Sequence, residues 1–260
     1  MLSNICFDAM SRRLLIDQGN SFCKIAFSEG SDLQPVAFVK PDQAVTYLAT
    51  RLHGASNIAV ALYCCVGGHH EPLREWLKTH ASRLIVLDEH TPIPIATNGY
   101  ERASLGADRI AAAVGALSMF PDKDHFLVID IGTAITFDWV DRKTGFRGGN
   151  ISAGPGLRAT GLHRHTALLP LVELDREEQY EGFAADTRSA LANGLFLGVR
   201  YEIEGYIAAV RTTYPDAMVL LTGGYAPYFA EKIKNVTFVE RLTMVGLNRI
   251  VAYNEEIEND

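Results

Sequence analysis

Two segments of the chain combine residue types that can bind phosphate. Residues 14–27 read LLIDQGNSFCKIAF and residues 127–138 read LVIDIGTAITFD, so each aliphatic run ends in Asp-x-Gly and a small polar residue. An Asp-x-Gly at a strand end predicts a tight turn with exposed backbone N–H groups, which bind anions. Asp17 and Asp130 can each hold a cation or its waters beside phosphates, because hard metals prefer carboxylate oxygen.

Glycines and polar side chains complete both turns. Gly19 and Gly132 permit unusual φ values and a close approach of phosphate to the backbone. The further donors in these segments are Asn20, Ser21 and Thr133, with Lys24 as a cation. A single Asp-x-Gly is more often a plain hairpin turn. Two copies half a chain apart favour a pair of turns that clamp a triphosphate.

Other phosphate-binding patterns are absent from the sequence. No GxxxxGK[ST] occurs, and no GxGxxG opens a βαβ unit, so a Walker loop and a dinucleotide fold are excluded. Two weaker glycine turns remain, GGNISAGPGLR at 148–158 and Thr222-Gly223-Gly224. The first is either a strand-to-helix connection or a ligand-facing loop. The second is either a generic turn or a place that leaves room for a flat base or ribose.

A carboxylate that could accept a proton lies in the segment SLGADRI, residues 104–110. Gly106 opens a predicted helix, so Asp108 lies in the first turn, where the helix dipole favours its ionised form. Phosphoryl transfer often uses such a carboxylate to take the proton of the attacking hydroxyl. Arg109 can bind a substrate carboxylate or a phosphate oxygen. From the residues alone, a capping Asp beside a surface Arg remains the alternative.

Alternating strand and helix signals predict an α/β fold around these motifs. Apolar β-rich runs predict strands at 14–16, 58–63, 84–87, 127–130 and 218–221. Helical patterns occur at about 41–53, 71–80, 106–119, 195–213 and 226–234. The acidic end, NEEIEND, predicts a frayed tail.

The two Asp-x-Gly segments also predict how the chain is divided. A spacing of half the chain is typical of a duplicated two-domain protein rather than of a solenoid with a shorter period. We expect an N-terminal domain over 12–122, a C-terminal domain over 123–260 and a hinge near 122–125. Residues 1–11 are expected to form a leader outside the pattern, with Met10 as an alternative start.

Composition restricts the class of partner. The 260 residues are 48% hydrophobic and carry a net charge of −7, which argues against nucleic acid because a phosphate backbone needs a broad Lys/Arg field. No apolar run approaches the roughly 20 residues of a membrane span. The four cysteines, Cys6, Cys23, Cys64 and Cys65, lack zinc spacing and predict buried free thiols. We therefore expect a cytoplasmic protein with neither a nucleic-acid nor a membrane partner.

Four motifs together resemble the type III pantothenate kinases: DQGNSFCK (17–24), GADR (106–109), DIGTAITFD (130–138) and GGNISAGPG (148–156). They occur in that family's order and spacing and cover most of the chain. The resemblance implies two duplicated actin-like (ribonuclease H-like) domains with a nucleotide cleft between them. It also implies ATP-dependent phosphorylation of pantothenate to 4'-phosphopantothenate, the first step of coenzyme A biosynthesis.

The resemblance also implies a role for each matching residue. Asp108 would be the general base, and Gly106, Ala107 and Arg109 would bind pantothenate with it. The ATP phosphates would be held by Asp17, Gln18, Gly19, Asn20, Ser21, Phe22, Cys23, Lys24 and Thr133. Asp130 would bind a monovalent cation, potassium or ammonium, and magnesium would accompany ATP.

Two further substrate contacts rest on looser patterns. Tyr100, in ATNGYERASLGADR, matches a substrate-contacting Tyr of the family, and Thr187, in AADTRSALANGLF, matches a substrate-side Thr. A packed aromatic residue and a helix N-cap are the respective alternatives. The resemblance also implies a homodimer with substrate sites near its interface.

The first motif departs from the family pattern at two positions. Gln18 stands where an aliphatic residue is common, and Ser21 stands where Thr is common. Both keep polar groups near the phosphates, so they bear on affinity more than on function. Two rival functions stay open: a kinase of the same fold with another small substrate, and a nucleotide-binding accessory or regulatory protein without turnover.

Overall fold

The chain divides into two compact units. A computed structural model describes residues 12–52, 58–66, 70–175 and 179–259. One unit comprises the described residues up to Met119 together with those from Arg241 onward, and the other runs Phe120–Glu240. The leader expected at residues 1–11 lies outside the described residues.

The first unit is built on a mixed sheet. Its described strands have the order β3-β2-β1-β5-β6, with β4 paired to β2. Strands β1 and β2 form an antiparallel hairpin, whereas β5 and β6 continue the sheet in parallel on the other side of β1. The bounds are β1 Arg12–Gln18, β2 Cys23–Glu29, β3 Asp32–Leu33, β4 Ala37–Val39, β5 Ile58–Cys65 and β6 Ala81–Val86.

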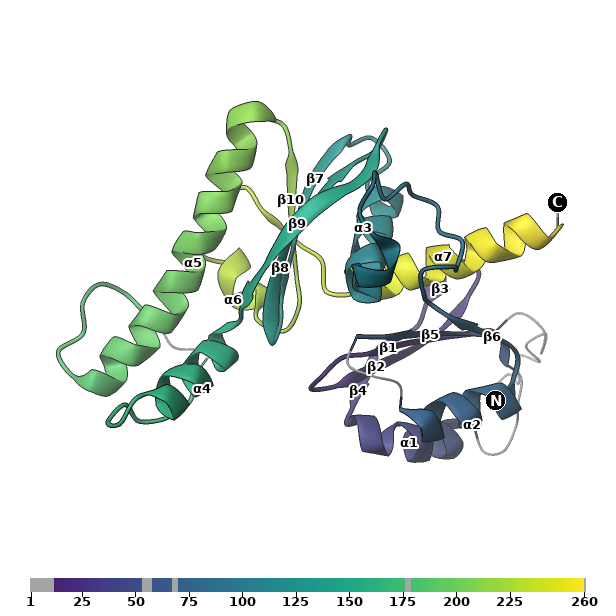
Figure 1. Ribbon diagram of the computed structural model, residues 1–260, viewed down its shortest axis with the longest axis horizontal. Helices are drawn as coiled ribbons and strands as arrows, with labels where there is room; N and C mark the ends of the chain where they lie inside the picture. The colour runs from purple at the N-terminus through teal and green to yellow at the C-terminus, as the bar shows by residue number, and fades with distance from the viewer. Residues whose placement is uncertain (1–11, 53–57, 67–69, 176–178, 260) are drawn as a thin grey trace, which may run out of the picture. The chain divides into compact units, whose positions relative to one another are not determined.

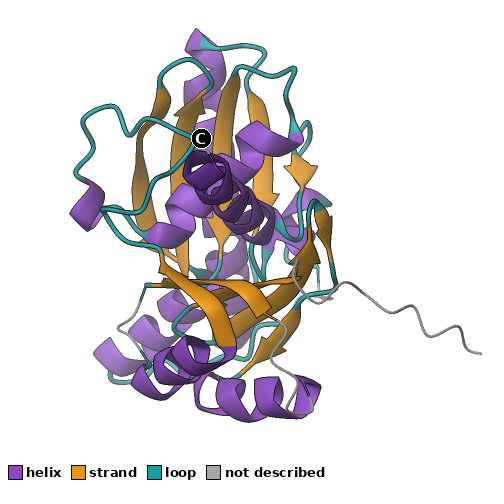
Figure 2. Ribbon diagram, turned by 90° about the vertical axis from the view of Figure 1, so that its right-hand side faces the viewer, coloured by secondary structure: helices purple, strands orange, loops and turns teal. Residues whose placement is uncertain are grey.

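Helices cover both faces of this sheet. Helices α1 (Ala44–Leu52) and α2 (Glu71–His80) lie under one face, where apolar residues spaced by four, such as Leu48 with Leu52 and Leu73 with Leu77, enter the core. Figure 2 shows the same helical layer beneath the sheet. Helices α3 (Ala107–Met119) and α7 (Leu242–Asn259) lie on the opposite face (Figure 1). Short 3₁₀ turns occur at η1 (Pro41–Gln43) and η2 (Arg102–Ser104).

The second unit repeats the plan of the first. Its described strands have the order β11-β10-β7-β8-β9, with β7, β8 and β9 antiparallel and β10 and β11 continuing in parallel beyond β7. Each unit therefore has a central first strand, a hairpin on one side and parallel strands on the other. The bounds are β7 His125–Ile131, β8 Ala134–Asp141, β9 Gly145–Ala153, β10 Met218–Thr222 and β11 Thr237–Phe238.

A long helix supplies most of the cover of the second sheet. Helix α5 (Thr187–Thr213) and helix α6 (Ala226–Ala230) pack Phe196, Val199 and Phe229 against the strands. Helix α4 (Pro155–His165) lies beside the first turns of α5 (Figure 1). The predicted strands and helices all occur, although α5 begins eight residues before the expected 195 because Asp186 caps it.

The division of the chain differs from the expected boundary at 122–123. The chain crosses between the units twice, after Met119 and after Glu240, so residues from Arg241 onward belong with the first unit. The cause is α7, which packs along α3 and against β1 and β5. The sequence predicts no helix in this segment, and local pattern does not say which sheet a helix will cover.

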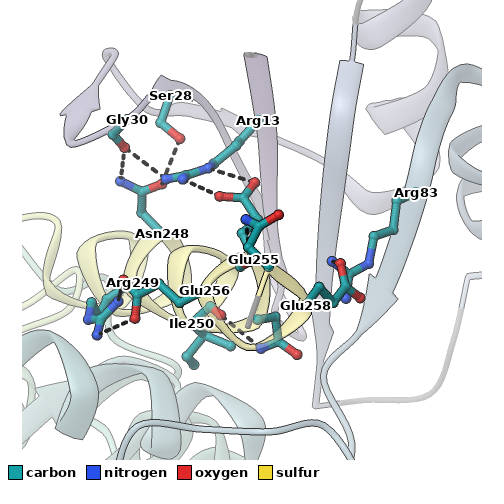
Figure 3. Close-up of polar contacts among 12 residues, drawn as sticks. Arg13, Ser28, Gly30, Arg83, Asn248, Arg249, Ile250, Glu255, Glu256 and Glu258 are labelled. Carbon is teal, nitrogen blue, oxygen red and sulfur yellow. Dashed lines mark hydrogen bonds and ion pairs between the residues drawn. The ribbon is translucent and has the colours of Figure 1, made fainter. Parts of the chain in front are cut away.

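The acidic end is helical, so the prediction of a frayed tail is wrong. Asn248 of α7 accepts hydrogen bonds from Arg13 Nη1 (3.0 Å) and Ser28 Oγ (2.8 Å) and donates to the Gly30 carbonyl (2.8 Å). Glu255 is paired with Arg13 and Glu258 with Arg83 (Figure 3). The acidic residues bind basic residues on β1 and β6, which keeps the last turns ordered.

Two glycines let α3 and α7 approach at backbone distance. A Cβ built on Gly246 would lie 1.7 Å from the Ala111 carbonyl oxygen, and one on Gly115 would lie 2.3 Å from the Leu242 carbonyl oxygen. Real Cβ atoms do not come that close to backbone. The contact therefore requires glycine on both helices.

We predict that Gly246→Ala destabilises the protein strongly. The added methyl must push the two helices apart, and such overpacking costs about 3 kcal/mol. Urea unfolding followed by circular dichroism measures the change. Gly205→Ala is the matched control, since Gly205 lies in α5 with nothing within 4 Å of its Cβ position. That variant should gain about 0.5–1 kcal/mol from helix propensity, and equal behaviour of the two variants would contradict the close-contact explanation.

Candidate active site

The first Asp-x-Gly segment forms a closed turn between β1 and β2. Gly19 N–H donates to the Phe22 carbonyl at 3.0 Å, so the turn spans four residues, and Asn20 and Ser21 are exposed at its tip. Gly19 does not take the positive φ that the sequence suggested. Its Cβ would lie 3.3 Å from the Phe22 oxygen, so glycine is favoured here by close approach instead.

Asp17 and Lys24 form an ion pair at the base of this turn. They are cross-strand partners in the hairpin, and Lys24 Nζ lies 2.9 Å from Asp17 Oδ2. Asp17 is only 3% exposed, whereas the Lys24 side chain is 31% exposed. A buried carboxylate needs a paired cation, and Lys24 supplies it from a side chain that is itself partly exposed.

The side chain of Gln18 points into the unit rather than toward the turn's tip. It is 7% exposed, and its Oε1 accepts a hydrogen bond from the Tyr63 hydroxyl at 2.7 Å. The same hydroxyl accepts the backbone N–H of His70 at 3.1 Å. Sequence reasoning gave Tyr63 no role. The available signal was the polar Gln18 at a position where the family pattern has an aliphatic residue.

Asp108 lies in the first turn of α3, as the sequence predicts. Its Oδ1 accepts the N–H of Arg109 at 2.8 Å. Arg109 is only 5% exposed, so the alternative of a surface arginine is wrong. Its guanidinium lies 5.8 Å from the centre of the Tyr100 ring, and Nη1 lies 3.4 Å from the Tyr100 hydroxyl. The structure thus brings three of the predicted substrate residues together.

The negative charges of Asp17 and Asp108 both affect the buried thiol of Cys64. Cys64 is fully buried on β5 as the parallel partner of Asp17. Burial, and then the negative charges of Asp17 and Asp108, raise the pKa of the Cys64 thiol well above its usual range, while Lys24 acts in the opposite direction. Burial, followed by the charge of Asp17, likewise raises the pKa of Cys23 to about 12. The carboxylates of Asp17 and of Asp108 therefore both lie near enough to Cys64 to act on its thiol.

The second Asp-x-Gly segment occupies the equivalent place in the second unit. Asp130 is the penultimate residue of the central strand β7, beside Thr222 of β10, and Thr133 is exposed in the turn that follows. Gly132 N–H donates to the Ala134 carbonyl at 2.9 Å, which closes the turn. Gly132, like Gly19, lacks a positive φ.

Two other glycines, Gly223 and Gly154, pack directly against this turn. A Cβ on either would collide with atoms of the turn itself. A Cβ on Gly223 would lie 2.3 Å from Asp130 Oδ1, and Gly223 has a φ of +94°. A Cβ on Gly154 would lie 2.1 Å from the Gly132 carbonyl oxygen. The Cβ position of Gly223 is thus filled by the Asp130 carboxylate and the backbone of Ile131. Gly154, at the N-terminus of α4, holds that helix against the turn.

Thr187 is exposed as the first residue of α5 in the second unit. The cap of that helix is Asp186, whose side chain accepts the N–H groups of Arg188 (3.0 Å) and Ser189 (3.1 Å). These hydrogen bonds keep the pKa of Asp186 below its usual range. The alternative of Thr187 as the N-cap is therefore wrong, and its hydroxyl is at the helix surface.

The donors available to a metal ion are oxygen atoms. Within residues 12–52, 58–66, 70–175 and 179–259, no group of three or more His, Cys, Asp or Glu side chains could hold a metal. The Asp130 carboxylate and the nearby Thr133 hydroxyl suit a hard cation that draws its other ligands from water or substrate. Across the described chain, none of the helices has the length and apolar character of a membrane span.

Comparison with known sequences identifies a matching family. The family model for type III pantothenate kinase matches residues 13–209. A type III pantothenate kinase of Bacteroides fragilis (strain ATCC 25285) is 39% identical over 243 residues, which covers 93% of this chain and 98% of the relative. One from Porphyromonas gingivalis (strain W83) is 36% identical over 249 residues, covering 94% of this chain and all of the relative.

Solved structures show the same fold at lower identity. A conserved Baf family protein from Campylobacter jejuni has a TM-score of 0.63 at 22% identity, covering 94% of this chain and 99% of its own. MreB5 of Spiroplasma citri bound to ADP has a TM-score of 0.52 at 11% identity, covering 97% and 100%. These likenesses confirm the predicted α/β fold of the actin-like ATPases and sugar kinases.

Proposed function

The chain belongs to the type III pantothenate kinase family and phosphorylates pantothenate with ATP in coenzyme A biosynthesis, and we propose that Asp108 is the general base of this transfer. The observation that carries the proposal is the position of Asp108 in the first turn of α3, beside the buried Arg109 and, like Asp17, near the buried thiol of Cys64. Transfer needs a proton acceptor next to the acceptor alcohol and cations next to the phosphates. The first unit contains both.

Arg109 and Tyr100 are proposed to bind pantothenate beside that base. The contact between the guanidinium and the tyrosine ring orients Arg109, and a guanidinium pairs well with the carboxylate that pantothenate carries. Gly106 and Ala107 precede Asp108 at the helix start, where backbone N–H groups face outward. Thr187, with its exposed hydroxyl, is proposed as a further substrate contact.

The turn from Asp17 to Lys24 is proposed to hold the phosphates of ATP. Its support is a closed hairpin turn with exposed polar residues, and a lysine whose side chain is partly exposed. Thr133 is the proposed phosphate donor from the second unit. The support for Thr133 is the equivalent topology of its own sheet, because each unit carries its Asp-x-Gly turn after its central strand.

The proposed step balances as a phosphoryl transfer. Asp108 accepts the proton of the pantothenate hydroxyl as its oxygen bonds to the γ-phosphorus of ATP. The bond from that phosphorus to the bridging oxygen breaks, and ADP leaves with the electron pair. Lys24 and Arg109 offset negative charge on the phosphates and the substrate.

Cations are proposed to complete the charge balance. Asp130, with Thr133, would hold a monovalent cation, potassium or ammonium, and magnesium would accompany ATP. Bound cations would neutralise phosphate charge near the second turn. The oxygen-only donor set supports this assignment, since hard cations prefer such ligands.

We predict that Asp108→Asn lowers kcat by about 10²–10⁴-fold, because the amide cannot accept the proton. The KM for ATP should stay within about twofold. ADP release in the presence of pantothenate measures both constants. Asp42→Asn is the matched control, as an exposed first-turn carboxylate of η1 in the same unit. Normal turnover by Asp108→Asn would remove Asp108 from the base role.

We predict that Asp130→Asn blunts activation by potassium. Wild-type activity should rise with potassium or ammonium at constant ionic strength, and the variant should show a much weaker response because the carboxylate ligand is gone. Rates are measured over a potassium titration, with Asp122→Asn as an exposed control in the same unit. If the rate of Asp130→Asn responded to potassium as the wild type does, Asp130 would not be the cation ligand.

A homodimer in the cytoplasm is the assembly and location we propose. Its support is an apolar surface on α4 and α5, where Leu157 and Leu162 are exposed around a groove of about 530 Å³. The groove is lined by Arg158, Leu162, Ala190, Leu191, Gly194 and Leu195. An exposed patch of this kind marks an interaction site. The free thiols Cys23, Cys64 and Cys65 fit a reducing compartment.

We predict a mass near twice 28.6 kDa in sedimentation equilibrium. Leu157→Glu combined with Leu162→Glu should yield the monomer, because two charges would be buried unpaired at the interface. Phe38→Glu is the control, since Phe38 is an exposed apolar residue on β4 of the first unit. A dimer that survives the double change would place the interface elsewhere.

A further inference from the structure

A buried hydrogen-bond relay lies behind the first phosphate turn. Tyr63 is fully buried on β5, and its hydroxyl donates to Gln18 Oε1 and accepts the N–H of His70. The Gln18 carbonyl in turn accepts the N–H of Val66 at 3.3 Å. Gln18 is thus held through both its side chain and its backbone by the strand beside it and the residues after it.

Gln18 is the residue between the Asp17 ion pair and the start of the Gly19 turn. A change in the rotamer or the backbone of Gln18 would therefore displace both the Asp17–Lys24 ion pair and the Gly19 turn. Tyr63 is itself held in place and can fix the position of Gln18, because β5 is paired with β1 on one side and with β6 on the other. The Tyr63 carbonyl also accepts Leu87 N–H at 3.0 Å, just beyond β6.

Tyr63 is a permanent hydrogen-bond donor. Burial raises the pKa of its phenol far above the usual range; the hydrogen bond from His70 acts against this, whereas a hydrogen bond with Cys65 and the charge of Cys23 act with it. The hydroxyl therefore keeps its proton at any assay pH. Without it, Gln18 Oε1 and the His70 N–H would each lose a partner, and a buried polar group without a partner is costly.

We propose that Tyr63 is a positioning residue that acts through Gln18 to hold the turn 17–24 in the conformation that binds ATP phosphates. This inference rests on the proposed function of that turn. Tyr63 is fully buried, so the role we assign to it is one of positioning. Where the family pattern has an aliphatic residue that packs, this chain uses a directed hydrogen bond.

A double-mutant cycle tests the relay. Tyr63→Phe should raise the KM for ATP about fivefold, the effect of one lost buried hydrogen bond. The kcat and the KM for pantothenate should stay within about twofold, since the turn and not the base is disturbed. In a Gln18→Leu background, Tyr63→Phe should change the KM for ATP by less than about 1.5-fold, because the acceptor is gone.

Three controls separate the relay from a structural role and from the proposed function. Tyr47→Phe removes a hydroxyl from α1 in the same core cluster and should leave the KM for ATP unchanged. Gln18→Asn leaves Tyr63 intact but places the amide out of its reach, so it should raise the KM for ATP even if Tyr63→Phe does not fold. Lys24→Met tests the turn itself and should raise the same constant.

The outcomes decide between the two ideas. A raised KM for ATP in Lys24→Met with none in Tyr63→Phe or Gln18→Asn overturns the relay and leaves the turn's function standing. Additive effects of Tyr63→Phe and Gln18→Leu also overturn it, since Tyr63 would then act by another route. An unchanged KM for ATP in Lys24→Met overturns the proposed function of the turn.

Discussion

A carboxylate at the end of a buried central strand is the constraint on which the site depends. Asp17 is shielded from solvent and must be paired, and the hairpin supplies Lys24 as its cross-strand partner. That pairing requires β2 to return antiparallel, which requires the tight turn that exposes Asn20 and Ser21, the residues proposed to bind phosphate. Ion pairing, hairpin geometry and anion binding are therefore consequences of one residue's position.

The second unit meets the same constraint by different means. Its central strand also ends near a carboxylate, Asp130, but the cross-strand partner is Thr136 and the parallel neighbour is Thr222. Hydroxyl groups replace the ammonium group and the thiol found around Asp17. The two turns share a topology but differ in the charge of the groups around the strand-end carboxylate.

Sequence reasoning predicted the parts of this protein that depend on local pattern. The central strands, five of the helices, the duplicated turns and the place of Asp108 follow from periodicity and turn chemistry, whereas helices α4 and α7 lie outside the predicted helical ranges. It did not predict features that depend on distant segments. The burial of Arg109, the close approach of Gly223 to Asp130 and the hydrogen bond from Tyr63 to Gln18 join residues whose proximity no local pattern records. The ordered acidic end is of the same kind, because its partner Arg13 lies 242 residues away.

The discontinuous first unit has a consequence for synthesis of the chain. Its sheet is made early, yet α7, which supplies the glycine contact with α3 and the partners of Arg13, is synthesised only after the whole second unit. The second unit, Phe120–Glu240, is continuous and is complete before that moment. The apolar face of β1 and β5 that α7 covers therefore stays exposed to solvent while the second unit folds. The nascent first unit is the state in which this protein is open to chaperones and to misassembly.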